Sequence, residues 1–334
     1  MTQESSAIAE RRLALPQSTA PGLLWGLLGV VAFSFTVPFT SVAVGGMSPL
    51  FIGSGRAVVA ALLAGAALSL TRQRLPRGSQ WVRLAVVGGG VVVGFPLLTS
   101  YALTTAPASH GAVVIALLPA ATATTAVLRG HERPPVAFWV IAGTGAVAAI
   151  ASASVQEGGL GQLRWSDLLL FGAVVAAAIG YAEGGLLSRE LGAWQTISWA
   201  LVLCSPLMGT LTLLSAVHGT PSGTAVQWAA FAYLGVVSMF LGFFAWYRGL
   251  AIGPMPQVSQ VQLAQPLLSI CWAALLLGEE LTWSTVLGGV VVILSAGAAV
   301  RVRLGTTPAD RRVAPRPVRP AAGVVPAASQ TASR

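Results

Sequence analysis

Apolar residues follow one another in long runs along most of this chain, and each run is about 20 residues long, the length of helix that crosses a hydrocarbon layer. No run alternates strictly between apolar and polar positions, as a barrel strand would. The pattern therefore predicts an all-α integral membrane protein with ten transmembrane helices. The expected spans are residues 22–44, 49–70, 83–103, 110–128, 135–154, 167–187, 197–217, 226–246, 256–277 and 283–300.

Three segments outside these spans are polar or rich in glycine or proline. Residues 1–21 are expected to form a cytoplasmic tail, and residues 155–165 a Gly-rich connector between two halves. Residues 303–334 are rich in Arg, Pro and Ala without periodicity, which predicts a disordered basic cytoplasmic tail. A cleaved signal peptide is the alternative for the first apolar run. That run is too long for a signal core, so we assign it to a helix.

The two halves resemble each other when the chain is shifted by about 147 positions. The aligned pairs are Trp81 with Trp228, Gly88 with Gly235, Leu103 with Leu250, Pro107 with Pro254, Pro119 with Pro266, and Glu132 with Glu279. Gly26 aligns with Gly172 at nearly the same shift, so the repeat extends over residues 22–154 and 166–302. Because each repeat contains an odd number of spans, the second is expected to lie inverted relative to the first, as in many secondary transporters.

Composition and charge agree with a membrane protein. Hydrophobic residues make up 55% of the chain and charged residues 9%, far below the charged share of soluble proteins. The net charge of +9 would suggest nucleic acid in a soluble protein, but the arginines lie between and beyond the spans, where they set orientation. We therefore expect no nucleic-acid partner. Placing both termini in the cytoplasm leaves Arg164 as the only arginine on the outer side. The absence of Lys and Asn fits a GC-rich bacterial gene, which favours the inner membrane.

Several short motifs resemble those of the drug/metabolite transporter superfamily, in particular its ten-helix EamA-like members. They are Trp25-Gly26, residues 251–254, Gln265-Pro266 and Leu277-Gly278-Glu279. The likeness covers residues 22–302. It implies a secondary transporter that moves a small polar or amphipathic solute, such as an amino acid, another metabolite or a drug. It further implies alternating access, coupling to a proton or other ion gradient, and no cofactor; we favour efflux over uptake. A homodimer is left open.

Two charged residues lie inside predicted spans and away from the span ends. Arg56 is in the middle of the span 49–70, where a charge costs about 2.5 to 3.5 kcal/mol on insertion scales. It is interpreted either as an anchor for a substrate carboxylate or as a structural charge paired with backbone carbonyls or Glu183. Glu183 itself is a candidate for proton coupling if it is buried, because desolvation favours the neutral carboxyl group. If its helix ends early, Glu183 lies instead at the cytoplasmic rim.

The ninth predicted span carries the glutamines Gln257, Gln260, Gln262 and Gln265. Three of them, Gln257, Gln260 and Gln265, fall within an arc of about 140° on a helix, so one face offers amide groups. We prefer a substrate site on this face; the alternative is interhelical hydrogen bonding. Tyr101 and Tyr181 complete the predicted substrate-binding residues.

Other distinctive residues are assigned to structure. Prolines inside the spans predict helix bends; they are Pro38, Pro96, Pro119, Pro206 and Pro266. The glycines at 88–90, 143 and 145 predict close helix packing. Cys204 and Cys271 have no motif spacing and are expected to pack as small apolar residues, with no disulfide and no metal site. Glu279 and Glu280 are expected to stabilise the N-terminus of the last helix.

Two alternatives to a transporter are a membrane-embedded enzyme and a non-transporting scaffold or channel. The three histidines, His110, His131 and His218, lie near span ends without a recognised catalytic spacing, so no catalytic residue is assigned. The chain also lacks a Walker-type loop for nucleotide.

Overall fold

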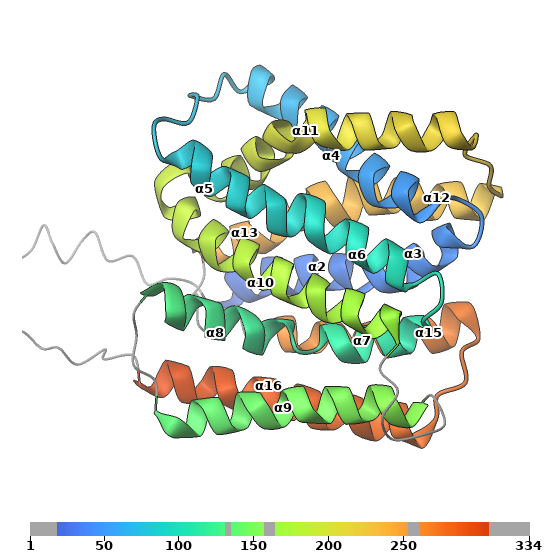
Figure 1. The fold of residues 1–334 in the computed structure, drawn as a ribbon. Coiled ribbons are helices and arrows are strands. Elements are labelled where there is room, and N and C mark those ends of the chain that lie inside the picture. Colours follow the sequence, from blue (N-terminus) through green and yellow to red (C-terminus); the bar gives the residue numbers. More distant parts are fainter. Residues whose placement is uncertain (1–18, 131–134, 157–163, 253–260, 307–334) are drawn as a thin grey trace, which may run out of the picture.

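The computed structural model describes residues 19–130, 135–156, 164–252 and 261–306, and every regular element in these ranges is helical (Figure 1). The first half contains α2 (Thr19–Ser34), α3 (Thr36–Val44), α4 (Pro49–Leu70), α5 (Gln80–Val87), the π-helical η1 (Gly88–Gly94), α6 (Phe95–Ala102), α7 (Ala108–Ile115), α8 (Leu118–Gly130) and α9 (Val136–Gln156). The second half contains α10 (Trp165–Leu191), α11 (Ala193–His218), α12 (Ala225–Tyr233), the π-helical η2 (Leu234–Leu241), α13 (Gly242–Ile252), the 3₁₀ turn η3 (Val261–Leu263), α15 (Ala264–Leu277) and α16 (Trp283–Thr306).

Within the described residues, seven helical stretches are long and apolar enough to cross a membrane. They are Pro21–Val44, Pro49–Leu70, Gln80–Ala102, Ala108–Arg129, Trp165–Ser188, Ala193–His218 and Ala225–Gly249. Shorter apolar helices coincide with the other three predicted spans, at Val136–Ala148, Val261–Leu277 and Thr285–Ser295. The all-helical membrane class is confirmed, and the total of ten spans stays a prediction. The structure does not describe residues 1–18, 131–134, 157–163, 253–260 and 307–334. The predicted substrate-binding residues Gln257 and Gln260 are among them.

Four of the predicted spans are interrupted instead of being continuous α-helices. The first breaks at Phe35, and the fourth breaks between α7 and α8. The third and eighth contain η1 and η2, which begin at nearly equivalent places in the two repeats. Four of the five predicted bends occur where proline is tolerated, within the first three residues of a helical segment, because proline has no N–H to donate. These prolines are Pro38, Pro96, Pro119 and Pro266, whereas Pro206 lies inside α11.

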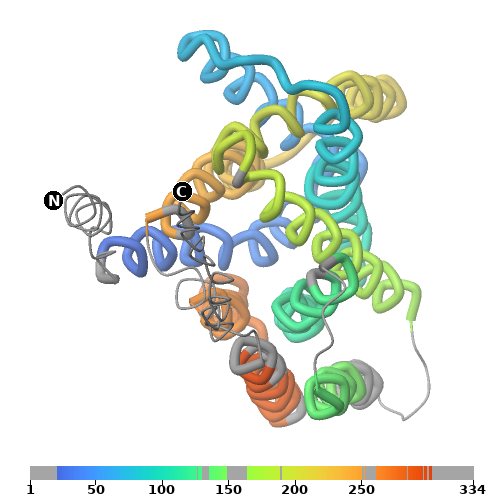
Figure 2. Tube along the Cα trace, turned by 90° about the vertical axis from the view of Figure 1, so that its left-hand side faces the viewer, coloured from blue at the N-terminus to red at the C-terminus, as the bar shows by residue number. Residues whose placement is uncertain are grey.

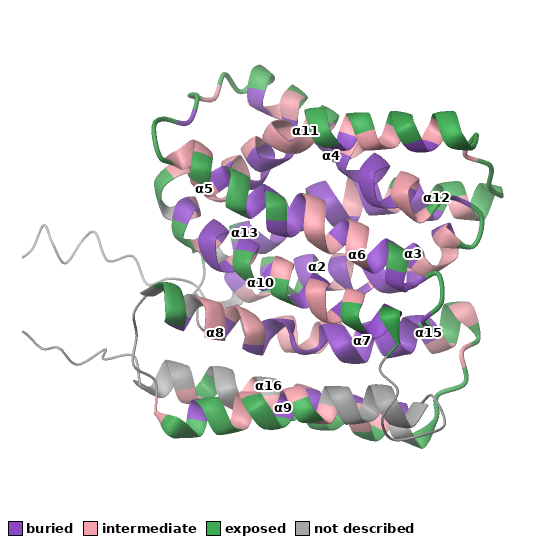
Figure 3. Cartoon of the chain, viewed as in Figure 1, coloured by how far each residue is buried: buried purple, intermediate pink, exposed green. Residues whose placement is uncertain are grey.

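Helices from the two halves pack against each other throughout the bundle. The main contacts join α4 to α11, α9 to α16, α2 to α13 and α8 to α10. Viewed along the bundle, α9 and α16 lie side by side at its periphery (Figure 2). Buried residues concentrate on the faces that meet, while large apolar side chains such as Leu62, Leu213 and Val290 are exposed on the outside (Figure 3). Such an apolar exterior suits lipid as the solvent.

The close helix packing predicted at glycines is confirmed at Gly88, Gly90 and Gly145, whereas a Cβ atom on Gly143 would have no atom within 4 Å. A Cβ atom built on Gly90 would lie 2.2 Å from the carbonyl oxygen of Ala176, and one on Gly88 would lie 2.3 Å from Sγ of Cys204. Gly89, between them, faces open space. Both cysteines are free thiols, so no disulfide joins Cys204 to Cys271.

Candidate functional site

Arg56 and Asp167 are the most deeply buried charged residues in the described part of the chain, each with 2% of its surface exposed. Nη1 of Arg56 donates to Thr40 Oγ1 at 3.4 Å and its Nη2 donates to Thr99 Oγ1 at 3.3 Å, both long for hydrogen bonds. Nε has no hydrogen-bond partner in the described part of the chain, and no described carboxylate forms an ion pair with this guanidinium. Burial of a guanidinium group with two long hydrogen bonds and no ion pair costs free energy, which suggests that a ligand supplies the missing hydrogen-bond acceptors.

Arg56 lines a cavity between the two halves of the chain. Its wall includes Thr36 from α3 and Phe95 from α6 in the first half, and Tyr181 from α10 and Ser238 from η2 in the second. The centre of a water molecule can occupy about 40 Å³ of it, room for roughly three waters. The helices must therefore separate before a larger solute can enter.

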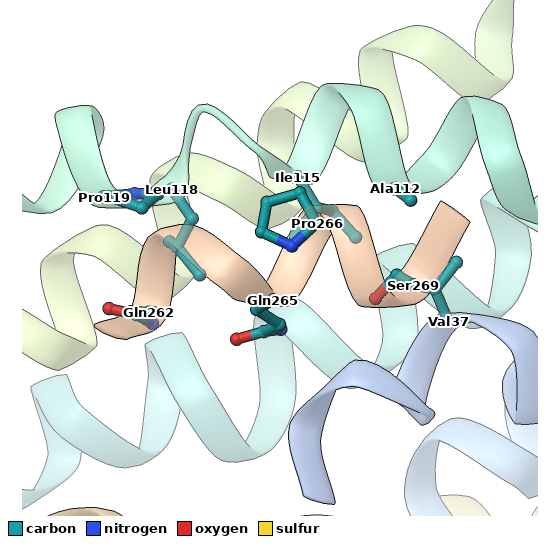
Figure 4. Close-up of a pocket in the computed structure, with 9 residues that line it drawn as sticks. All are labelled: Val37, Ala112, Ile115, Leu118, Pro119, Gln262, Gln265, Pro266 and Ser269. Atoms are coloured by element: carbon teal, nitrogen blue, oxygen red, sulfur yellow. The ribbon is translucent and has the colours of Figure 1, made fainter. Parts of the chain in front are cut away.

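A smaller pocket adjoins this cavity along α15. The two share Val37, Leu118 and Gln265 as lining residues. Figure 4 shows the side chain of Gln262, from η3, and that of Gln265, from α15, on the same side of this helical segment, with Pro266 and Ser269 further along α15. Amide groups thus line the small pocket and, through Gln265, extend into the cavity that contains Arg56.

The interruptions of the helices coincide with the cavity wall. Thr36 follows the break at Phe35, Ser238 belongs to η2, and Leu118 is the first residue of α8. Irregular backbone at membrane depth is tolerated where it is buried in protein or lines a polar cavity, and π-helical segments are frequent at functional sites. The N-terminal ends of α8 and α15 both reach the wall, and the positive end of a helix dipole favours an anion.

The predicted substrate-binding residues are partly brought together. Arg56, Tyr181 and Gln265 line one cavity, although they come from three separate helices. Tyr101, at the end of α6, is 43% exposed and lines neither this cavity nor the pocket beside it. Gln257 and Gln260 lie outside the described residues. Gln262, which the face argument left out, lines the adjoining pocket.

Glu183 lies outside the cavity, in an ion-pair cluster about two turns before the C-terminal end of α10. Its Oε1 accepts a hydrogen bond from Nε of Arg83, and its Oε2 accepts one from Nε of Arg129 at 3.0 Å. The side chain is 7% exposed. The suggested pair between Arg56 and Glu183 is therefore wrong. Two guanidinium partners are typical of a structural carboxylate that joins α10 to α5 and α8, so this geometry favours a structural role over proton coupling. The rim interpretation required the helix to end early, and it is wrong because α10 continues to Leu191.

Replacing Glu183→Gln is expected to lower the free energy of unfolding by about 1 to 2 kcal/mol, because two charge-assisted hydrogen bonds lose their acceptor charge while both arginines keep access to water. Denaturation in detergent micelles would measure this. Glu190→Gln is the matched control, since Glu190 pairs with Arg83 alone and its side chain is 48% exposed. A larger loss for Glu190→Gln than for Glu183→Gln would contradict the assigned role.

Comparison with known proteins identifies the family. The model of the EamA-like transporter family matches residues 20–154 and again residues 164–300. The chain belongs to the EamA-like transporter family. It is 41% identical over 283 residues to a Bacillus subtilis protein named "Uncharacterized transporter YdeK", a match that covers 85% of this chain and 98% of that protein.

One more distant relative of this EamA-like transporter and one solved structure extend the comparison. A protein of Streptantibioticus cattleyicolor named "Probable terminal-alkyne amino-acid exporter" is 25% identical over 301 residues, covering 86% of this chain and 98% of that protein. A protein of known crystal structure is similar with a TM-score of 0.58 at 19% identity, covering 86% of this chain and 99% of that one. The last match shows likeness of fold alone.

A second polar contact joins the two halves of this EamA-like transporter at the opposite end of α10. His110 Nε2 and Asp167 Oδ1 are 2.7 Å apart, and both side chains are less than 5% exposed. Asp167 Oδ2 also accepts from the backbone N–H of Arg164 at 2.9 Å, as a capping residue. Neither repeat alignment nor motif spacing predicted this pair, because the two residues are 57 positions apart in sequence.

Glu279 is structural, as expected, but it stabilises a different helix. Its Oε1 accepts from the backbone N–H of Ala108 at 2.7 Å, and its Oε2 accepts from that of Ser109 at 2.8 Å. The carboxylate therefore caps the N-terminus of α7 in the first half, instead of the last helix. The sequence did not indicate this contact, because Glu279 and Ala108 are 171 positions apart.

The hydroxyl groups of the site were missed entirely. Thr40 and Thr99 accept from Arg56, and Thr36 Oγ1 lies 2.7 Å from Ser238 Oγ across the boundary between the halves. Threonine and serine commonly satisfy backbone carbonyls within membrane helices, so their sequence carries no signal for a site.

Proposed function

We propose that this protein is a secondary transporter of a small solute that carries a carboxylate, with an amino acid as the preferred class. Arg56 is the observation that supports this most directly. It is a buried guanidinium in a cavity between the halves, with an unsatisfied Nε and no described carboxylate partner. A carboxylate can accept two hydrogen bonds from guanidinium in a planar arrangement. Gln265 and Tyr181 supply polar groups for the rest of the solute.

We further propose ten spans arranged as two inverted repeats, residues 22–154 and 166–302. The directions of equivalent helices support this arrangement. In Figure 1, α2 runs from left to right and its counterpart α10 from right to left; α4 and its counterpart α11 likewise run in opposite directions. A bundle of this kind can rock one repeat against the other around a central site.

Alternating access requires contacts at the two ends of the cavity to break in turn. The Glu183 cluster and the His110–Asp167 pair both involve α10, near its opposite ends. With 1.5 Å of rise per residue, the 16 residues between Asp167 and Glu183 correspond to about 24 Å. Each contact also joins α10 to helices of the first half. We infer that they stabilise the closed state of the inner and the outer entrance, respectively.

Orientation is proposed from the distribution of arginines. The connection between α4 and α5 and the C-terminal ends of α8, α13 and α16 lie at the same end of the bundle, on the left in Figure 1. These segments carry seven of the eleven arginines of the described residues, namely those at 72, 74, 77, 129, 248, 301 and 303, which supports a cytoplasmic location of that end and of both termini under the positive-inside rule. The protein would then reside in the inner membrane. Export, coupled to a proton or other ion gradient, is the preferred direction.

The proposal is tested by solute flux in proteoliposomes containing the purified protein. We expect labelled amino acids to move on the order of tenfold faster than in protein-free liposomes, and the amines that lack the carboxylate to move at the protein-free rate. Imposed proton and sodium gradients, compared with no gradient, identify the coupling ion. Equal transport of amino acids and their amines would reject the carboxylate assignment, and flux at the protein-free rate for every solute class would reject transport.

A further inference from the structure

A basic pocket lies outside the central cavity, at the end of the bundle that contains the Glu183 cluster. Its walls are the connection between α4 and α5 and the corner between α10 and α11. The centre of a water molecule can occupy about 510 Å³ of it. Gln195 Nε2 donates to Gln73 Oε1 at 3.3 Å across the two walls, which holds them together. The pocket is therefore a wide concavity at the surface whose two walls are joined by a hydrogen bond.

The lining of this pocket carries an excess of positive charge. Arg72, Arg74 and Arg77 line it, and none of them has an ion-pair partner among the described residues. Glu190 is the one carboxylate in the lining. Hydrogen bonds from Arg83 and from the Gln80 amide hold the pKa of Glu190 below its ordinary value, so it stays ionised and already paired. The three guanidinium groups consequently lack an anion.

Aromatic and apolar residues indicate the depth of the pocket in the membrane. Trp199 lines it, and Trp81 packs edge-on against Trp199 with 6.1 Å between ring centroids. Tryptophan concentrates at the boundary between headgroups and acyl chains. The apolar helix α4 ends beside the pocket at Leu70, which is 84% exposed. The arginines thus lie at headgroup level, with an apolar surface next to them.

We infer that this pocket binds the phosphodiester headgroup of an anionic phospholipid. Guanidinium groups bind phosphate oxygens in pairs, and clustered arginines beside membrane helices attract anionic lipid. A zwitterionic lipid brings its own cation and gains less from the same arginines. Free inorganic phosphate shares the anionic chemistry but has no acyl chains to cover Leu70. A bound headgroup would touch the connection between α4 and α5 as well as the α10–α11 corner, and so link the two halves.

The test measures lipid retention by native mass spectrometry and thermal unfolding of the full-length protein in detergent. Phosphatidylglycerol, phosphatidylcholine and inorganic phosphate are the three probes. The variant Arg72→Gln/Arg74→Gln/Arg77→Gln is compared with Arg311→Gln/Arg312→Gln/Arg316→Gln, which removes the same charge from a segment outside the described residues. We expect the pocket variant to retain phosphatidylglycerol about tenfold less than wild type, and the control variant to match wild type. Phosphatidylglycerol should also raise the unfolding temperature more than the other probes.

Three outcomes would overturn this inference. They are an equal loss of retention in both triple variants, equal stabilisation by phosphatidylcholine, and stabilisation by inorganic phosphate as large as that by phosphatidylglycerol. If the pocket variant does not fold, the single change Arg74→Gln replaces it, because Arg74 is exposed and donates no hydrogen bond that α4 or α5 needs. A reduction of about threefold in retention is then expected, and unchanged retention would count against the site.

Discussion

Replacing Arg56→Met is expected to reduce transport of a carboxylate-bearing solute by about 100-fold while leaving the protein at least as stable as wild type. The loss follows because removing one member of a buried, hydrogen-bonded charge pair costs several kcal/mol in the complex. The stability follows because, without solute, Arg56 is a buried charge whose Nε is unsatisfied, and methionine fills a similar volume without that desolvation cost. Flux in proteoliposomes and denaturation in detergent measure the two effects separately.

A loss of transport without a loss of stability distinguishes a binding role of Arg56 from a structural one. If Arg56 mainly holds α4 to Thr40 and Thr99, Arg56→Met will lower stability and transport together, and the anchor assignment fails. Arg248→Gln is the control, because Arg248 is exposed and its guanidinium lies over the Trp25 ring at 5.3 Å, away from the cavity lining. That variant should transport at the wild-type rate.

Replacing Asp167→Ala is expected to lower the free energy of unfolding by about 3 kcal/mol, the largest stability loss that we predict. The change removes the acceptor 2.7 Å from Nε2 of the buried His110 and the cap on the backbone N–H of Arg164. It should also loosen the contact between α7 and α10. Equilibrium unfolding in detergent provides the measurement.

The variant Asp167→Asn separates the contribution of the carboxylate charge to stability from that of the hydrogen bonds. Asparagine keeps one oxygen, which can accept from the backbone N–H of Arg164, while its amide N–H can donate to Nε2 of a neutral His110. A loss of no more than about 1 kcal/mol is therefore expected if neutral hydrogen bonds suffice. A loss equal to that of Asp167→Ala would show that the carboxylate charge is required. A wild-type stability for Asp167→Ala would remove the basis for assigning this pair to the closure of one entrance.

The span boundaries could be predicted because lipid imposes a simple rule on sequence. A helix in lipid satisfies its own backbone and needs an apolar exterior of fixed length, so the run of residues 49–70 coincides with α4. The positions at which the predicted spans are interrupted were harder to predict from the sequence. Pro38 and Pro119 marked two of them, but η1 and η2 contain no proline, and their π-helical geometry results from packing.

For the candidate site, the sequence identified single residues and missed their partners. Arg56 and Gln265 were recognisable because a charge and an amide are rare in an apolar span and must be compensated. Glu183 was recognised for the same reason, yet its partners Arg83 and Arg129 were assigned to loops and orientation. Nothing local distinguishes an arginine that sets topology from one that extends back to a carboxylate on another helix.

The sequence by itself determined that this chain is a helical membrane protein built from two related halves, since hydrophobic length and internal repetition are properties of the chain alone. Only the tertiary structure decided which polar groups meet. It places Arg56 with Tyr181 and Gln265, Glu183 with Arg83, His110 with Asp167, and Glu279 with the start of α7. The physical reason is that short-range hydrogen bonds and ion pairs depend on distances of a few ångströms between helices, and the order of residues along the chain leaves those distances open until the helices pack.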